Sequence, residues 1–302
     1  MTNLPREKRA RLILNTDAKN EADDQFTIVH ALLTPTFDFH GIIAAHFGDH
    51  RSKTAMEDSR KEIDHLLDLM DLSGRIPVAN GAATALPDEE TAVPSPGAQM
   101  IIDEAMKDDD RPLYVAFLGP LTDMASALLM EPKLNERNVI CVWIGGGTWP
   151  SGGREFNLMN DIASANVVMR SKIQVWQIPS TVYRMMSVSY AELQERCEDK
   201  GPIGKYLVDQ LIDWNLRVHK GPIEHRSLGD TPSLSVILNP MGGTYEWRPA
   251  PEFSPHMHYV HTGQHRPIKV YDSIDIRYIL EDFYAKLARF HRGVQDLANF
   301  GE

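Results

Sequence analysis

Short apolar runs alternate with segments of helical periodicity along most of this 302-residue chain. Each run is followed by a polar or glycine-containing turn, and the runs are rich in Val, Ile or aromatic residues: Arg11–Asn15, His40–Phe47, Leu113–Leu118, Val139–Ile144 and Ile173–Ile178. Strands that alternate with crossover helices pair side by side in the same direction. The pattern therefore predicts an α/β fold with a mainly parallel sheet flanked by helices, an arrangement similar to Rossmann folds.

The carboxy-terminal third follows a less regular pattern. We expect a helix over Ile203–Val218, a Pro- and Gly-rich passage over Asn239–Pro255, and a final helix over Ile274–Arg292. Between the last two, a hairpin is predicted from the runs HMHYVH and PIKVYD, with its turn at Gly263–Gln264. Because no linker or internal repeat interrupts the chain, residues 1–302 are expected to form a single domain.

Charge and composition exclude several classes of protein. With 31 basic and 42 acidic residues, the net charge is −11, which argues against binding to nucleic acid. No apolar stretch approaches the length of a membrane span, so no membrane partner is expected. Cys141 and Cys197 lie in unlike contexts and suggest neither a disulfide framework nor a zinc site. These features predict a cytoplasmic, reducing location.

The segment from Asn15 to Asp24 is the most informative one for function, because four acidic residues crowd one turn between the first strand and a helix. In parallel sheets, ligands bind beyond the carboxyl ends of the strands. Carboxylates gathered there repel one another unless a cation or a polyhydroxyl ligand is present, and oxygen ligands suit Ca²⁺ or Mg²⁺. A simpler interpretation is that Asp23 and Asp24 open the helix, where its dipole favours negative charge.

This turn resembles the signature of the inosine–uridine-preferring nucleoside hydrolase family, in which a D-T-D-like triplet ends the first strand and an acidic pair opens a helix. Further pieces follow in the family's order. Gly48-Asp49 stands for its Gly-Asn, Leu118–Ala125 resembles its G-P-L-T-N-I-A segment, Glu155–Asn157 matches its E-F-N, and Gly229-Asp230 replaces its His-Asp. Together these pieces span residues 12–238.

The resemblance implies the hydrolysis of the N-glycosidic bond of a small-molecule riboside to ribose and a free base. It implies a Ca²⁺ held by Asp17, Asp24, Asp230 and the backbone carbonyl of Leu118. Asp17 would also act as the general base on a water molecule. The ribose hydroxyls would be held by Asp23, Asp49, Glu155 and Asn157. A homodimer or homotetramer is the assembly that the resemblance implies.

The chain departs from the family pattern at several positions. Asn15 replaces the first acid of the triplet, and Asn20-Glu21 makes the turn longer by about two residues. Gly229 stands where purine-accepting members carry a His near the leaving base, so either another acid protonates the base or the leaving group needs little help. The candidates near the base are His219, His225, Arg226, Tyr183 and Arg184, of which we select His225. Trp149 is a further possible contact to base or sugar.

Two alternatives remain open. The loss of the His at Gly229 is compatible with a non-catalytic relative that binds ribose or a nucleoside without efficient turnover. An Asp-rich turn after the first strand also suits a metal-dependent phosphohydrolase, although Asn15 argues against a version with a nucleophilic Asp at the start of a D-x-D motif.

Overall fold

The computed structural model describes residues 4–294 and 296–300. The strands are β1 (Ala10–Thr16), β2 (Phe37–Ala44), β3 (Val78–Asn80), β4 (Leu113–Phe117), β5 (Val139–Ile144), β6 (Gln174–Ile178), β7 (Ser187–Ser189), β8 (His225–Ser227), β9 (Thr244–Pro249), β10 (Glu252–Phe253), β11 (Tyr259–Val260), β12 (Pro267–Ser273) and β13 (Asn299–Phe300). The helices are α1 (Asp24–Leu32), α2 (Ala55–Leu69), α3 (Pro96–Ala105), α4 (Thr122–Met130), α5 (Phe156–Asn160), α6 (Ile162–Arg170), α7 (Ser180–Tyr183), α8 (Tyr190–Leu193), α9 (Gly201–Val218), α10 (Pro232–Leu238) and α11 (Ile276–His291). Shorter helical turns lie at Arg6–Lys8, Pro132–Glu136 and Gln194–Glu198.

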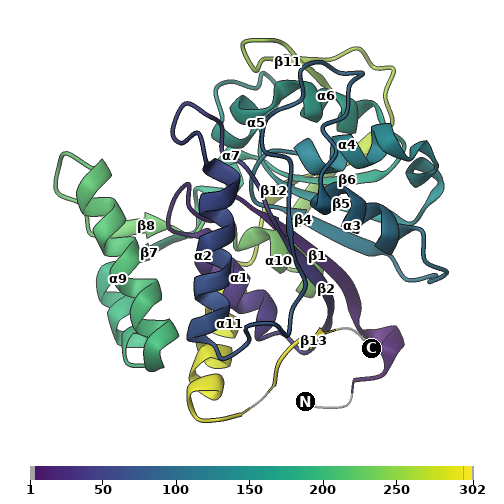
Figure 1. Cartoon of the computed structure of the whole chain (residues 1–302). Coiled ribbons are helices and arrows are strands. Elements are labelled where there is room, and N and C mark those ends of the chain that lie inside the picture. Colours follow the sequence, from purple (N-terminus) through teal and green to yellow (C-terminus); the bar gives the residue numbers. More distant parts are fainter. Residues whose placement is uncertain (1–3, 295, 301–302) are drawn as a thin grey trace.

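One large sheet organises the chain (Figure 1). Its strands follow the order β13-β2-β1-β4-β5-β6-β12-β9, with β3 paired to β2. All the strand pairs from β13 to β12 are parallel, and β9 runs antiparallel to β12 at the edge. The chain leaves β1 toward β2 and later returns to the other side of β1 as β4. The carboxyl ends of β1 and β4 therefore flank the switch point where α/β sheets bind ligands.

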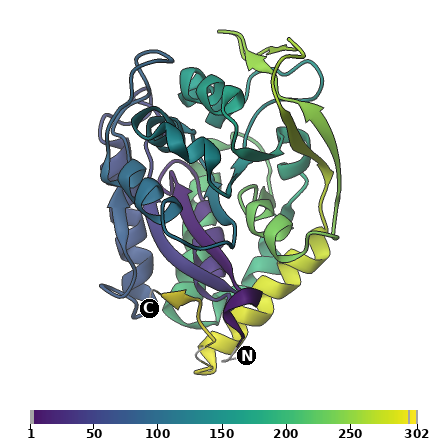
Figure 2. The same ribbon diagram turned by 90° about the vertical axis from the view of Figure 1, so that its right-hand side faces the viewer.

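Helices cover both faces of this sheet, and each face has its own apolar core (Figures 1 and 2). Along β1 the fully buried side chains alternate between the two cores: Leu12 and Leu14 belong to one, and Ile13 belongs to the other. The first core includes side chains of α1, α2, α9, α10 and α11, and the second includes those of α3, α4 and α6. Burial on both faces explains why the strands read as nearly continuous apolar runs.

The predicted fold class is confirmed, and the five predicted strands correspond to β1, β2, β4, β5 and β6. The predicted bounds of the second strand, His40–Phe47, were three residues too late, because β2 runs from Phe37 to Ala44. Its limits are set by pairing with β1, whose register with β2 runs from Ala10↔Phe37 to Thr16↔Ala44.

The predicted carboxy-terminal hairpin was wrong. β12 does not pair with the HMHYVH run; it lies between β6 and β9. Within that run, Tyr259–Val260 forms β11, which pairs with β10. The reason is that Ile268 and Val270 on β12 are fully buried, so β12 belongs to the main sheet. The antiparallel partner of β12 is β9, which lies in the Pro- and Gly-rich passage where no strand was predicted. The final helix is confirmed as α11.

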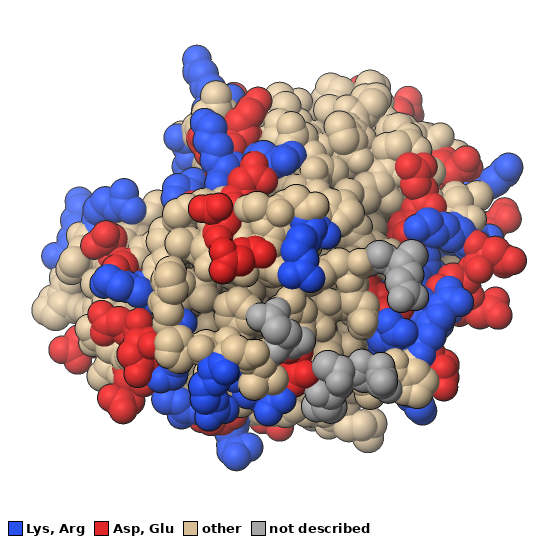
Figure 3. All heavy atoms as spheres, turned by 60° about the horizontal axis from the view of Figure 1, so that its bottom comes forward, with Lys and Arg blue, Asp and Glu red and all other residues tan. Residues whose placement is uncertain are grey.

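Charged side chains of both signs are interspersed on the face drawn in Figure 3. Near the chain ends, a cavity of about 860 Å³ is bordered by Arg6 from the first described turn and Phe300 from β13. Its charged groups are largely paired with one another, as in Arg111 with Asp38 and Asp109. Within residues 4–294 and 296–300, no helix is both long and apolar enough to cross a membrane.

Candidate active site and metal centre

A smaller cavity of about 70 Å³ lies at the carboxyl ends of β1, β4 and β5, beside the switch point. Its lining comprises Asp17, Asn20, Glu21, Asp23, Asp24, Leu118, Ile144, Glu155, Phe156, Asn157, Tyr183, Gly229 and Asp230. Segments more than 200 residues apart thus meet at one place, because the carboxyl ends of parallel strands share one edge of the sheet. No Lys, Arg or His belongs to this lining among the described residues.

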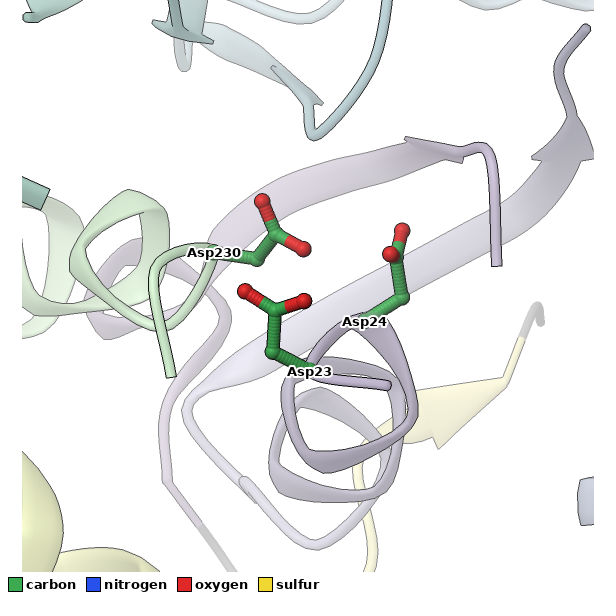
Figure 4. Close-up of side chains that lie close together, drawn as sticks. All are labelled: Asp23, Asp24 and Asp230. Carbon is green, nitrogen blue, oxygen red and sulfur yellow. The ribbon is translucent and has the colours of Figure 1, made fainter. Parts of the chain in front are cut away.

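Three aspartates form the centre of this cavity. Asp23 and Asp24 come from the start of α1, and Asp230 comes from the turn before α10 (Figure 4). One carboxylate oxygen of each lies within 4.8 Å of those of the other two. All three side chains are buried, with exposed fractions of 9%, 2% and 6%. The resemblance implied Asp17, Asp24 and Asp230 as the carboxylate ligands. In the structure, the third member of the close group is Asp23.

Asp17 lies in the same cavity, directly after β1, and is 1% exposed. Its Oδ2 atom is buried and has no hydrogen-bond partner within the protein. Its side chain packs so closely against the backbone after β4 that a Cβ on Gly119 would come within 2.9 Å of its Cγ. This carboxylate thus lies close against the Gly119 backbone, and one of its oxygens has no partner within the protein.

Hydrogen bonds orient two of the other carboxylates. The Thr16 hydroxyl at the end of β1 donates to Asp24 Oδ1 at 2.5 Å. The Gly229 backbone amide donates to Asp23 Oδ2 at 2.8 Å. A side chain at position 229 would be crowded, because a Cβ there would lie 3.1 Å from Tyr183 Cδ2 and 3.3 Å from Asp23 Oδ2. Gly229, which stands where the family pattern has a His, therefore suits the limited space beside Tyr183 and Asp23.

Burial and mutual repulsion disfavour ionisation of these carboxyls in the protein alone. Burial, followed by repulsion from Asp24, raises the pKa of Asp17 well above its ordinary value. Burial also raises the pKa of Asp23 to about 6, although Arg226 opposes the change. Burial and the neighbouring Asp23 raise the pKa of Asp24 to about 7. The pKa of Asp230 is raised for the same reasons, by burial first and then by Asp24.

These residues fit a hard divalent cation. The donors are all oxygen atoms, the carboxylates repel one another, and Asp17 Oδ2 has no partner inside the protein. A cation such as Ca²⁺ would remove the repulsion and supply the missing contact. Leu118 lines the same cavity, and its main-chain carbonyl accepts a hydrogen bond of 2.7 Å from Asn157 Nδ2. Because a carbonyl oxygen has two lone pairs, this bond leaves one for a ligand.

Glu155 and Asn157 also line the cavity, at the start of α5. Glu155 caps the helix: its carboxylate accepts hydrogen bonds from the amides of Asn157 and Leu158 and from Gly146 N. The Tyr183 hydroxyl adds a fourth bond to Oε1 at 2.9 Å. Burial and the adjacent carboxylate raise the pKa of Tyr183 far above its ordinary value, so this hydroxyl keeps its proton.

The lengthened turn after β1 is held from two sides. Arg51 donates to the Asn20 carbonyl at 3.1 Å and lies 4.3 Å from the centre of the Phe156 ring. Arg226 on β8 forms an ion pair with Glu21. Sequence reasoning did not assign Asn20, Glu21 or Phe156 to the site. The inserted residues themselves were the available signal, since an insertion next to a ligand-binding turn tends to reshape the cavity wall.

Three predicted site residues lie outside the cavity lining. Asp49 is exposed in the loop after β2. Trp149 packs edge-to-face on Tyr259, with its Nε1 atom donating to Gln177 at 3.0 Å. His225 is exposed on β8, which pairs with β7. The structure gives no geometric support to these three, and their roles remain predictions.

Of the other base-side candidates, His219 and Arg184 are also exposed. Arg226 is paired with Glu21 as described above, and only Tyr183 among the five lines the cavity.

Comparison with known proteins identifies the family. Residues 12–273 match the model of the inosine-uridine preferring nucleoside hydrolases. The chain belongs to this family. It is similar to the pyrimidine-specific ribonucleoside hydrolase RihA of Citrobacter koseri, with 27% identity over 225 residues that cover 66% of this chain and 69% of the relative. The protein of the same name from Escherichia coli O1:K1 is 26% identical over the same shares of the two chains.

Solved structures of nucleoside hydrolases share the fold. The purine-preferring ribonucleoside hydrolase from Gardnerella vaginalis superimposes with a TM-score of 0.78 at 19% identity, covering 93% of this chain and 99% of that one. The inosine-uridine preferring enzyme from Bacillus anthracis gives a TM-score of 0.62 at 19% identity, with coverage of 94% and 99%. The family match confirms the predicted enzyme class, an N-glycosidase of the nucleoside hydrolase family.

Proposed function

We propose that this nucleoside hydrolase relative is a Ca²⁺-dependent enzyme that releases ribose from ribonucleosides, with Asp17 as the general base. The observation that carries the proposal is the convergence of four buried aspartates, Asp17, Asp23, Asp24 and Asp230, on a cavity whose described lining contains no basic side chain. Buried carboxylates are costly unless a counter-charge is bound. When bound, the cation would lower the pKa of a water and draw in the ribose hydroxyls.

The protein's own groups would then divide the remaining work. Asp17 would accept a proton through its Oδ2 atom, which has no hydrogen-bond partner within the protein. Asp23 and Asn157 both line the cavity and would hold ribose hydroxyls. Fixed negative charge around the sugar stabilises the oxocarbenium-like transition state of glycoside cleavage. Glu155 already accepts four hydrogen bonds, so a ribose hydroxyl would reach it by replacing the Tyr183 hydroxyl, which is the side-chain donor among the four.

The leaving group receives little help from this cavity. Tyr183 is a poor acid, because burial and Glu155 raise its pKa, and His225 lies on the surface. With weak general-acid assistance, the rate should depend strongly on how readily the base departs as an anion. We therefore propose ribosides with good leaving groups as the preferred substrates and keep His225 as the candidate acid to be tested.

The test is release of reducing sugar from a panel of purine and pyrimidine nucleosides and 4-nitrophenyl riboside, with Ca²⁺ or with a chelator. Wild type is compared with Asp17→Ala, and Asp68→Asn on the exposed face of α2 is the matched control. We expect turnover that the chelator abolishes, that Asp17→Ala lowers by at least about 1,000-fold and that Asp68→Asn leaves unchanged. If no riboside is cleaved, the proposed activity is refuted, and tight riboside binding without cleavage would indicate the non-catalytic alternative.

A further inference from the structure

Asn15 and Asp123 depart from the family pattern at two distant positions. Asn15 stands where the D-T-D-like triplet has its first acid, and Asp123 stands where the G-P-L-T-N-I-A segment has its Asn. The structure joins them: Asn15 Nδ2 donates to Asp123 Oδ2 at 2.9 Å across 108 residues of sequence. Both side chains are buried, with exposed fractions of 0% and 2%. Relative to the family pattern, the acid and the amide thus stand at swapped positions, and in this chain they are hydrogen-bonded to each other.

The surroundings of Asp123 make this exchange possible. Its Oδ1 atom accepts two hydrogen bonds, from the Ala82 amide at 2.8 Å and from the Ser95 hydroxyl at 2.6 Å. Its Oδ2 atom faces Asn15 and is so tightly enclosed that a Cβ on Gly81 would come within 2.4 Å of it. An amide at position 123 would keep an oxygen for Ala82 and Ser95 and place its nitrogen opposite residue 15. Either arrangement of acid and amide therefore fits the same donors around residue 123, while Asn15 Oδ1 is buried without a hydrogen-bond partner.

The pair includes a residue of β1 that lies close in sequence to the proposed catalytic carboxylate. Asn15 is on β1 two residues before Asp17, and its backbone carbonyl accepts a hydrogen bond of 2.9 Å from Leu118 N. Asp123 lies in the first turn of α4, where the helix dipole favours a negative charge. The hydrogen bond between them ties the end of β1 to the start of α4. Since Asp17 packs tightly on Gly119, a small shift of β1 would displace both Asp17 and the Leu118 carbonyl.

We propose that Asn15 and Asp123 form an exchanged amide–carboxylate pair that positions Asp17 and the Leu118 carbonyl, and that the two substitutions compensate for each other. The structural part of this inference stands on the hydrogen bonds alone. The part that concerns catalysis rests on the proposed function.

A double-mutant cycle tests the pair. The thermal midpoints of wild type, N15D, D123N and N15D/D123N are measured in chelator, so that no metal contributes. N15D places two carboxylate oxygens opposite each other without a hydrogen between them. We expect the thermal midpoint of N15D to fall by about 5 °C or more. D123N should fall less, because the Asn15 amide can turn to present its oxygen. The double variant should recover at least half of the loss caused by N15D.

A second double variant, N15D/D68N, separates specific pairing from net charge. It has the same formal charge as N15D/D123N but removes an exposed carboxylate on α2, so its midpoint should match that of N15D. Rescue by D68N, or the absence of rescue by D123N, would overturn the exchanged pair. This outcome does not depend on whether the protein cleaves any riboside.

Turnover with Ca²⁺ tests the positioning role. We expect N15D to lower kcat at least tenfold with a smaller change in KM, and N15D/D123N to return kcat to within threefold of wild type. If the midpoint recovers while kcat remains tenfold lower, the pair is structural and the positioning role is refuted. If the midpoints show the expected coupling but wild type releases no sugar, the proposed function fails while the pair stands.

Discussion

The stability of the metal-free protein should depend on the charge of the buried acidic cluster, and Asp24→Asn is the substitution that exposes this dependence. Asp24 is 2% exposed, and its pKa is raised from 3.8 to about 7 by burial and by Asp23. A carboxyl whose pKa is higher in the folded state binds its proton more tightly there than in the unfolded chain. Its ionisation therefore costs stability, which is lost as the pH rises from about 4 to about 7.

The magnitude follows from the same values. An increase in pKa from 3.8 to about 7 corresponds to about 4 kcal/mol at about 1.4 kcal/mol per pKa unit. Asp24→Asn keeps an oxygen that can accept the Thr16 hydroxyl bond, so this contact survives the change. In chelator at pH 8, the variant should consequently be more stable than wild type by up to about 4 kcal/mol. At pH 4 the two proteins should differ little.

Ca²⁺ should reverse this order, because the cation stabilises the ionised cluster of wild type and the variant lacks one of its carboxylates. The assay is urea unfolding of both proteins at pH 4, 6 and 8, in chelator and in Ca²⁺. Burial lowers the pKa of His30 to about 4, which works in the opposite direction between pH 4 and 6.5. The difference between wild type and variant at each pH removes this shared contribution.

The exposed Asp68→Asn substitution on α2 is the matched control, and it should change stability by less than about 0.5 kcal/mol at every pH. The reasoning is refuted if Asp24→Asn destabilises the metal-free protein as much at pH 8 as at pH 4. It is also refuted if Ca²⁺ stabilises wild type and Asp24→Asn equally.

Three further predictions concern the leaving group and the cavity wall. His225→Ala should change kcat for nucleosides by less than about threefold, because the side chain is exposed outside the cavity; a fall of about 100-fold in steady-state assays would establish it as the general acid. Tyr183→Phe removes a hydroxyl that is committed to Glu155, so kcat should stay within threefold and stability should fall by about 1 kcal/mol in urea unfolding; a loss of activity comparable to that of Asp17→Ala would contradict this. In a comparison of substrates, kcat for 4-nitrophenyl riboside should exceed that for inosine by at least about 100-fold, since the described lining offers little acid assistance, and equal rates would reveal an efficient acid.

Local sequence patterns were sufficient to predict the strands that carry the site. β1, β4, β5 and β6 are apolar because helices bury both of their faces, and this requirement is visible in each segment alone. Asp17, Asp23 and Asp24 could also be selected from the sequence as candidates, because four acidic residues crowd the turn after a buried strand, although the helix dipole offered a simpler reason for Asp23 and Asp24. In contrast, β9 has mostly exposed side chains, so its sequence lacks an apolar signal and β12 was assigned the wrong partner.

The tertiary structure alone decided which residues share the cavity. Asp23 lies beside Asp24 and Asp230 in the cavity, where the Gly229 amide orients its carboxylate. His225 and Trp149 lie outside the lining because pairing of β8 with β7 and packing against Tyr259 determine where these side chains lie.

The contact between Asn15 and Asp123 shows most clearly that the sequence alone does not reveal which polar groups meet. Asn15 was visible in the sequence as a departure from the family triplet, but its pairing with Asp123 depends on a hydrogen bond across 108 residues. Composition and periodicity indicate which apolar side chains of each segment are buried. Which polar groups meet depends on how the strand ends converge, and only the folded chain determines that geometry.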